Sequence, residues 1–305
     1  MISRYTYQGL TWVDLESPTR EEILHISEEF NLPQLVGQEM FSSTLHSKVD
    51  LYDHFIYLIL HFPVANKRNH EQTEQEIDFV IGKDFFLTVR YELIDSVHEF
   101  SKIFEVSSLL NRSHIVTHGG FIFMEMMKQF YKYSLRELEE ITHTIRAIEH
   151  GIFSGEEGAM VKSISHTSRR LLDFKQAIRF HHDVLQSYES SSKRFFGEDY
   201  GYYASVITAE FNKVNTMLES NRDILKELQR TNDSLLSTKQ NDITRTFTIM
   251  SFITFPLMLV SSVFAMRLPD HILLINNFAE FFFVLGAMVI IGCVMLLFFK
   301  VRKWL

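Results

Sequence analysis

The sequence predicts a membrane protein with an N-terminal α/β domain, a very long helix and two membrane-spanning helices at the C-terminus. Two apolar runs without charge, 246–266 and 281–299, flank a short polar loop near the end of the chain. As a helix, each run approaches the roughly 30 Å of the hydrocarbon core of a bilayer. In addition, glycine and proline are absent from the helical pattern at 202–240. These observations together indicate a C-terminal helical-hairpin anchor at the end of a stalk.

The first part of the chain, residues 1–120, is expected to form a cytoplasmic α/β domain. Segments rich in aromatic and β-branched residues are the expected strands: 10–15, 52–62, 75–81 and 85–91. The turn-like residues 82–84 predict that the last two strands form a hairpin. Ser17 and Pro18 have the residue types that cap and begin a helix, and this helix should end before Pro33.

Amphipathic helices are expected from residue 121 onward. The segment 121–200 is interpreted as a helical hairpin with a break at 151–158, and 201–245 as a cytoplasmic stalk helix that continues into the first span. Asparagines 221 and 232 fall on a heptad seam of the stalk. The apolar seam positions are Phe211, Val214, Leu218, Leu225, Leu228 and Leu235. Because so long a helix is exposed on many sides, the seam predicts oligomerisation.

Basic residues beside the apolar runs predict the orientation in the membrane. Lys239 and Arg245 precede the first span and the tail 300–305 is basic, whereas the loop 267–280 contains the single basic residue Arg267. Cytoplasmic segments carry the excess of lysine and arginine. We therefore expect a multi-pass protein of the inner (plasma) membrane, with both termini in the cytoplasm and the loop outside.

Composition and motifs argue against several function classes. The net charge of -8 and the pI of about 6.0 differ from the strongly basic footprint of nucleic-acid-binding domains. Cys293 is the one cysteine and lies inside the second span, so a disulfide within the chain is impossible. The sequence contains no Gly-rich phosphate loop, no His-Glu-x-x-His motif and no nucleophile elbow. Neither an enzyme nor a bound cofactor is expected.

The order of these parts resembles the CorA superfamily of divalent metal-ion transporters. The resemblance covers essentially the whole chain and includes short matches at 14–18, at 241–245, at Pro256-Leu257 and in the tail 300–305. It implies a homopentamer in a lipid bilayer, with an axial pore formed by the first spans. The transported or regulatory ion would be a divalent cation such as magnesium, zinc or cobalt.

The family signature Gly-Met-Asn is replaced in this chain by Ala265-Met266-Arg267. In the family, a ring of asparagines offers amide oxygens to a hydrated cation at the pore mouth, whereas arginine offers only donors and a fixed charge. Five guanidinium groups about 8 Å from a divalent ion would cost on the order of 5 kcal/mol at the dielectric of water, before salt screening. Pairing with the outer-loop acids Asp270 or Glu280 lowers this cost. The resemblance therefore implies a pore with altered selectivity.

The resemblance also implies a set of pore positions along the first span. Asn241 matches a pore-lining asparagine at the cytoplasmic mouth. The pore-lining or gate positions are Thr244, Phe247, Thr248, Ser251, Phe255, Met258 and Ser262. Rings of phenylalanine at Phe247 and Phe255 would close such a pore by dewetting. Ordinary packing is the alternative explanation for aromatic residues at this spacing.

Two residue pairs on the predicted amphipathic helices have the types that bind transition metals. Glu139 and His143 are four residues apart and share a helix face, and His182 is followed by Asp183. A solvated helix face is the alternative for both pairs.

Two alternatives to a cation channel follow from the altered signature. In one, a ring of Arg267 plugs the mouth of a non-conducting pentamer that acts as a membrane-bound regulator or structural partner. In the other, the same ring attracts anions, so that the pore is anion-permeable.

Overall fold

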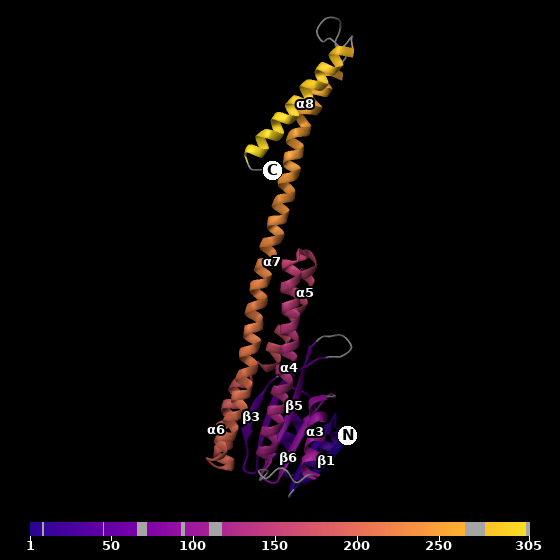
Figure 1. Ribbon diagram of the computed structural model, residues 1–305. Helices are drawn as coiled ribbons and strands as arrows, with labels where there is room; N and C mark the ends of the chain where they lie inside the picture. Colours follow the sequence, from indigo (N-terminus) through magenta and orange to yellow (C-terminus); the bar gives the residue numbers. More distant parts are fainter. Residues whose placement is uncertain are drawn as a thin grey trace. The chain divides into compact units, whose positions relative to one another are not determined.

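The computed structural model describes residues 1–7, 9–44, 46–65, 72–92, 95–109, 118–265 and 278–302. The chain forms two compact units, Met1–Gln229 and Arg230–Leu305. Its helices are α1 (Arg20–Glu29), α2 (Gln34–Glu39), α3 (Asp95–Leu109), α4 (Gly119–Phe153), α5 (Glu157–Ile178), α6 (His181–Phe196), α7 (Tyr200–Ala265) and α8 (Phe278–Val301), as Figure 1 shows.

A six-stranded sheet forms the centre of the first unit. Its strands are β1 (Ile2–Tyr7), β2 (Leu10–Glu16), β3 (Lys48–Leu51), β4 (Phe55–Ala65), β5 (Gln72–Gly82) and β6 (Phe85–Arg90). They lie in the order β1-β2-β6-β5-β4-β3, with β2 and β6 parallel and the other neighbours antiparallel. The hairpin predicted around residues 82–84 is confirmed, whereas β1 and β3 were not predicted.

Helix α1 begins later than the sequence predicted. Thr19 is its N-cap: the Thr19 hydroxyl accepts from the Glu22 amide at 3.3 Å, and the Glu22 carboxylate accepts from the Thr19 amide at 2.8 Å. This capping box satisfies two amide donors of the first turn. Ser17 instead has a φ of 42° and donates its hydroxyl to the Tyr91 carbonyl at 2.6 Å. The predicted cap at Ser17 is therefore wrong, because this side chain is bonded beyond the end of β6.

The expected helical hairpin at 121–200 contains three helices. The second predicted helix is divided at Arg179–Phe180, where α5 ends and α6 begins. His181, the first residue of α6, is fully buried and hydrogen-bonded to the sheet. Both ring nitrogens of His181 have partners, as a buried polar group requires.

Helices pack against both faces of the sheet. On one face, Val80 of β5 belongs to the same buried cluster as Ile23 of α1 and Val36 of α2. On the other face, Phe79 of β5 meets Phe123 of α4, with ring centroids 5.2 Å apart. The period of two along β5 thus sends neighbouring side chains into two different apolar layers.

His181 connects the sheet to the helices. Its Nε2 lies 2.7 Å from the main-chain carbonyl oxygen of His61 in β4, and its Nδ1 lies 2.8 Å from the hydroxyl of Tyr131 in α4. Because a carbonyl only accepts, Nε2 carries the hydrogen and Nδ1 accepts from the tyrosine. The His181 ring also lies 5.8 Å from that of Phe211 in α7. Burial lowers the pKa of His181 to about 4, which keeps this ring neutral.

The apolar seam of α7 is covered within the chain over the first unit. Its seam residues Phe211, Val214, Leu218, Leu225 and Leu228 are each at most 8 % exposed. Asn221 of the same seam is 3 % exposed, donates to the carbonyl of Leu138 at 3.1 Å and accepts from the hydroxyl of Thr142 at 3.0 Å. Both partners belong to α4. The expectation that this part of the seam mediates oligomerisation is therefore wrong, because the chain itself already covers it.

Replacing Asn221 by alanine is expected to destabilise the protein by about 1 to 3 kcal/mol, because it removes both amide bonds to α4 and leaves a buried gap. The measurement is the thermal unfolding midpoint of the full chain in detergent. Asn241→Ala is the matched control on the same helix, since Asn241 is exposed. Equal midpoints for the two variants would contradict the assigned role of Asn221.

Acid is expected to destabilise the protein through His181. The ordinary histidine pKa is near 6.5 and the folded value is about 4, so between these values the unfolded chain binds the proton and the folded chain does not. The contribution is present above pH 6.5 and is lost as the pH falls toward 4, by up to about 3 kcal/mol. The measurement is the unfolding midpoint of the full chain across this range.

The His181→Gln variant should show a smaller acid-induced fall in the unfolding midpoint. Part of the fall persists because burial also lowers the pKa of His118 to about 4. His182→Gln is the control: its side chain is exposed, and its pH profile should match that of the wild type. An unchanged profile in His181→Gln would refute the role assigned to His181.

Candidate functional site

Helix α7 contains the segment best suited to cross a membrane. In the described part of the chain, the helix from Tyr200 to Val263 is long enough and has a sufficiently apolar stretch to do so, and Leu285–Val301 of α8 is a shorter apolar helix. Proline 256 lies inside α7 and has no amide hydrogen, so the carbonyl of Phe252 lacks its usual partner four residues on. Membrane helices tolerate such a proline when other groups satisfy the freed carbonyl.

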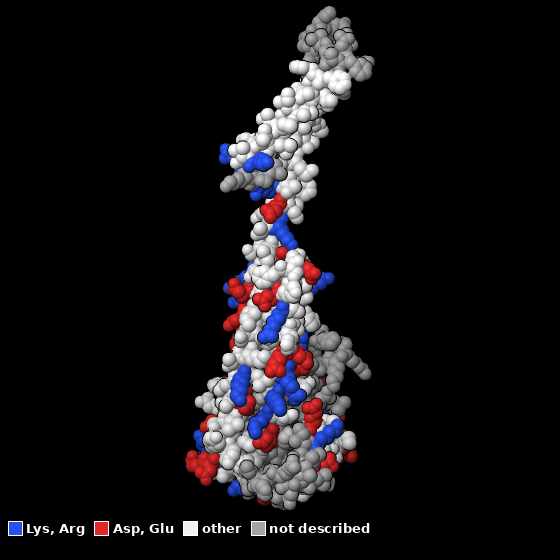
Figure 2. All heavy atoms as spheres, in the orientation of Figure 1, with Lys and Arg blue, Asp and Glu red and all other residues white. Residues whose placement is uncertain are grey.

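Apolar side chains are exposed along the last part of α7. Phe247 is 66 % exposed and Phe255 is 63 % exposed. Figure 2 shows few charged atoms on the visible face of this part of α7 and of α8, with lysine and arginine atoms near the C-terminal end. Large apolar side chains exposed over such a length indicate a surface covered by lipid or by another protein chain.

Helix α8 covers one side of this segment. Ile249 is 7 % exposed, and the ring of Phe252 lies 6.4 Å from that of Phe299 in α8. At 3.6 residues per turn, Phe247 and Ser251 lie roughly half a turn away from Ile249. The pore positions implied by the resemblance therefore include residues on the side of α7 that α8 leaves uncovered.

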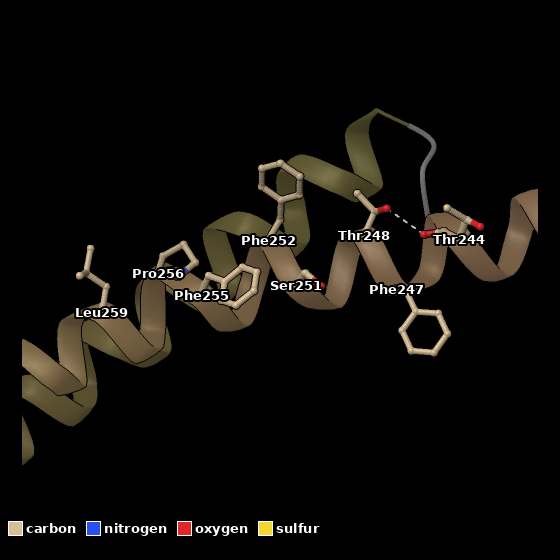
Figure 3. Close-up of a pocket in the computed structure, with 8 residues that line it drawn as sticks. All are labelled: Thr244, Phe247, Thr248, Ser251, Phe252, Phe255, Pro256 and Leu259. Carbon is tan, nitrogen blue, oxygen red and sulfur yellow. Dashed lines mark hydrogen bonds between the residues drawn. The ribbon is translucent and has the colours of Figure 1, made fainter.

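A pocket of about 780 Å³ lies along α7 and brings several of these positions together (Figure 3). Phe247 points to one side of the helix in this view, Thr248 and Phe252 point to the other, and the ring of Phe255 lies over the ribbon. The lining residues are Thr244, Phe247, Thr248, Ser251, Phe252, Phe255, Pro256 and Leu259.

Three of the implied pore positions do not line this pocket: Asn241 and Ser262, which are exposed, and Met258, which is 57 % exposed. Sequence reasoning did not include Phe252, Pro256 and Leu259. The first two continue the row Thr244–Thr248 at intervals of four residues, and this period was the signal that could have found them. The pocket therefore combines two neighbouring rows of the helix.

Hydroxyl groups are the polar component of the pocket lining. Thr248 Oγ1 donates to the carbonyl of Thr244 at 2.8 Å, a bond drawn in Figure 3. Thr246, outside the pocket lining, makes the equivalent bond to the carbonyl of Asp242 at 2.9 Å. A threonine hydroxyl in a helix commonly donates in this way to a main-chain carbonyl of the preceding turn. No charged side chain lines this pocket.

The altered signature lies at the edge of the described structure. Ala265 is the last residue of α7, and Glu280 lies in the first turn of α8, but the described side chains do not include these two. Met266, Arg267 and Asp270 lie outside the described residues.

The two metal-binding pairs suggested by the sequence are not part of a common site. Glu139 and His143 are exposed on α4, and His182 and Asp183 are exposed on α6. Within the described ranges, no three or more His, Cys, Asp or Glu side chains are grouped so that they could hold a metal ion.

Known proteins similar to this chain match it over nearly its whole length. The Thermotoga maritima cobalt/magnesium transport protein CorA is 22% identical over 97% of this chain and 83% of its own length. The putative metal ion transporter YfjQ of Bacillus subtilis is 26% identical over 96% of this chain and 89% of its own length.

The fold is also that of a solved transporter. The complete structure of the CorA magnesium transporter from Methanocaldococcus jannaschii aligns with a TM-score of 0.83 at 17% identity, covering 99% of this chain and 94% of that one. Residues 7–303 match the family model described as "CorA-like Mg2+ transporter protein". The chain therefore belongs to the family of CorA-like Mg²⁺ transporter proteins.

Proposed function

We propose that this protein transports divalent metal cations across the plasma membrane. The observation that carries the proposal is the pocket along α7, where the hydroxyl groups of Thr244, Thr248 and Ser251 interrupt a long apolar surface. The relatives add support, because those from Thermotoga maritima and Bacillus subtilis are named as transporters of cobalt and magnesium or of metal ions. The ion is the substrate of this protein, and the catalysis of a chemical reaction is not part of the proposal.

The transporting species is a homopentamer. Five copies of α7 surround an axis in this proposal, so that the pocket residues of each copy face the ion path or the neighbouring copy. The apolar exposure of Phe247 and Phe255 supports an arrangement in which further chains cover α7. Rings of these phenylalanines form constrictions that exclude water when closed.

The basic residues Lys239, Arg245, Lys300 and Arg302 support an orientation with both termini in the cytoplasm. The loop 267–280 then lies outside. In this orientation the ion enters beside Ala265-Met266-Arg267, passes the hydroxyl-bearing part of α7 and leaves past Asn241.

Arg267 changes the selectivity of the entrance. Its fixed positive charge replaces a neutral amide oxygen, and repulsion of a divalent ion by five such charges is on the order of 5 kcal/mol before screening by salt. A non-conducting regulatory pentamer is the second candidate function, favoured by this same substitution. An anion-permeable pore is the third outcome of the test.

Replacing Arg267 by asparagine is expected to raise Mg²⁺ influx at least tenfold, because it removes the positive ring and restores an acceptor at the mouth. The measurement is influx into proteoliposomes loaded with a magnesium-sensitive dye. Arg267→Lys is the matched control, since it keeps the charge and should keep the wild-type rate.

Three outcomes separate the candidate functions. Influx by the wild type supports cation transport, with the variant faster. Influx by Arg267→Asn alone supports a competent pore that its own arginines block, which is the regulatory candidate. Chloride-driven potentials without Mg²⁺ influx support the anion pore, and an inert wild type together with an inert variant would contradict transport altogether.

Native mass spectrometry of the full chain in detergent tests the assembly. The expected result is a complex of five copies of the 35.9 kDa chain. The apolar exposure of α7 would disappear between copies, so the complex should persist at high salt. A monomer or dimer as the sole species would contradict the pentamer.

A further inference from the structure

In the membrane segment of α7, the hydroxyl hydrogen of Thr248 is already engaged in a hydrogen bond. Thr248 Oγ1 lies 2.8 Å from the carbonyl oxygen of Thr244, and of these two atoms only the hydroxyl can donate. A hydroxyl has one hydrogen and two lone pairs. The Thr248 oxygen is therefore left as an acceptor toward the pocket.

The surroundings of Thr248 hold this state in place. Threonine is branched at Cβ, which restricts its side chain to few rotamers. In Figure 3 the hydroxyl of Thr248 points back along the helix toward Thr244. Phe252 and Phe255, one and two turns on, line the pocket beside it.

An acceptor in this position distinguishes cations from anions. The water molecules around a divalent cation point their hydrogens outward, and these hydrogens need acceptors. An anion needs donors, and Thr248 can supply its hydrogen only by breaking the bond to Thr244. The lining of this pocket contains no lysine, arginine or histidine that could serve an anion instead.

We propose that Thr248 is a specificity-determining residue of α7 that selects hydrated divalent cations over anions by presenting a hydroxyl oxygen as acceptor only. This inference rests on the proposed transport function and adds to it the group that decides the sign of the charge. It assigns cation selection to a position near the cytoplasmic end of the membrane segment, far along the helix from the Arg267 entrance. Five copies of Thr248 would surround the hydrated ion with acceptors.

The chain offers a matched control on the same helix. Thr246 donates to the carbonyl of Asp242 at 2.9 Å, so its local bonding equals that of Thr248. Two residues correspond to roughly half a turn of helix, which places Thr246 on a different side. Accordingly, Thr246 is not among the residues that line the pocket.

Reversal potentials of the full chain in planar bilayers, measured under a MgCl₂ gradient, test the inference. Thr248→Val keeps the shape and removes the acceptor, so the permeability ratio of Mg²⁺ to chloride should fall about tenfold. Thr248→Ser keeps the hydroxyl and should stay within about twofold of the wild type. Thr246→Val should leave the ratio unchanged.

The outcomes separate this inference from the function on which it rests. A wild-type ratio in Thr248→Val, or an equal fall in Thr246→Val, overturns the role of Thr248 and leaves transport standing. If the wild type is inert, the same series is made in the Arg267→Asn background, where the same fall supports the inference. Absence of current in both backgrounds overturns the inference together with the proposed function.

Discussion

The covering of α7 is the constraint on which the rest of the structure depends. In the first unit the apolar side of this helix is narrow, and it is buried within the chain at Val214, Leu218 and Leu225, beside α4. Toward its C-terminus the helix becomes apolar around most of its circumference, and Phe247 and Phe255 are exposed. Burial of apolar surface is favourable for both parts of the helix. The chain itself covers the first part but leaves apolar side chains of the C-terminal part exposed. A bilayer and further copies of the chain supply the missing cover in the proposed function.

Buried polar groups fix the way in which the first unit holds α7. Asn221 has its amide paired with α4 through Leu138 and Thr142, and His181 joins the sheet to α4. A hydrogen bond requires its donor and acceptor at a defined distance and angle, whereas apolar contacts tolerate a range of positions. These polar pairs therefore favour one alignment of the elements that they join. Asn232 differs, because it is 1 % exposed and neither atom of its amide has a hydrogen-bond partner among the described residues. Burial of an amide without such partners costs desolvation free energy.

In the membrane part of α7, a local hydrogen bond determines whether a threonine hydroxyl can donate or only accept. A threonine hydroxyl in water both donates and accepts hydrogen bonds. The hydroxyl of Thr248 donates its hydrogen to the carbonyl of Thr244, so only its lone pairs remain available. The pocket beside it has apolar walls and no charged side chain. In a region of low dielectric, the orientation of a few dipoles has a larger effect than it would have in water. Charge selection in this protein is therefore proposed to depend on two separate elements, the Arg267 entrance and the hydroxyls of α7.

The sequence by itself determined the elements that depend on local periodicity. The hairpin of β5 and β6, the helical character of 202–240 and the apolar runs all follow from the spacing of side chains along one segment. The pocket positions Thr244, Phe247, Thr248, Ser251 and Phe255 were indicated by a resemblance in addition to their spacing. Tertiary structure decided what covers each element. A heptad seam has the same pattern whether its partner belongs to the same chain or to another, so only the fold could show that α4 pairs with Asn221. The bond between His181 and the carbonyl of His61 likewise joins residues far apart in the chain, so the spacing of side chains along one segment could not show it.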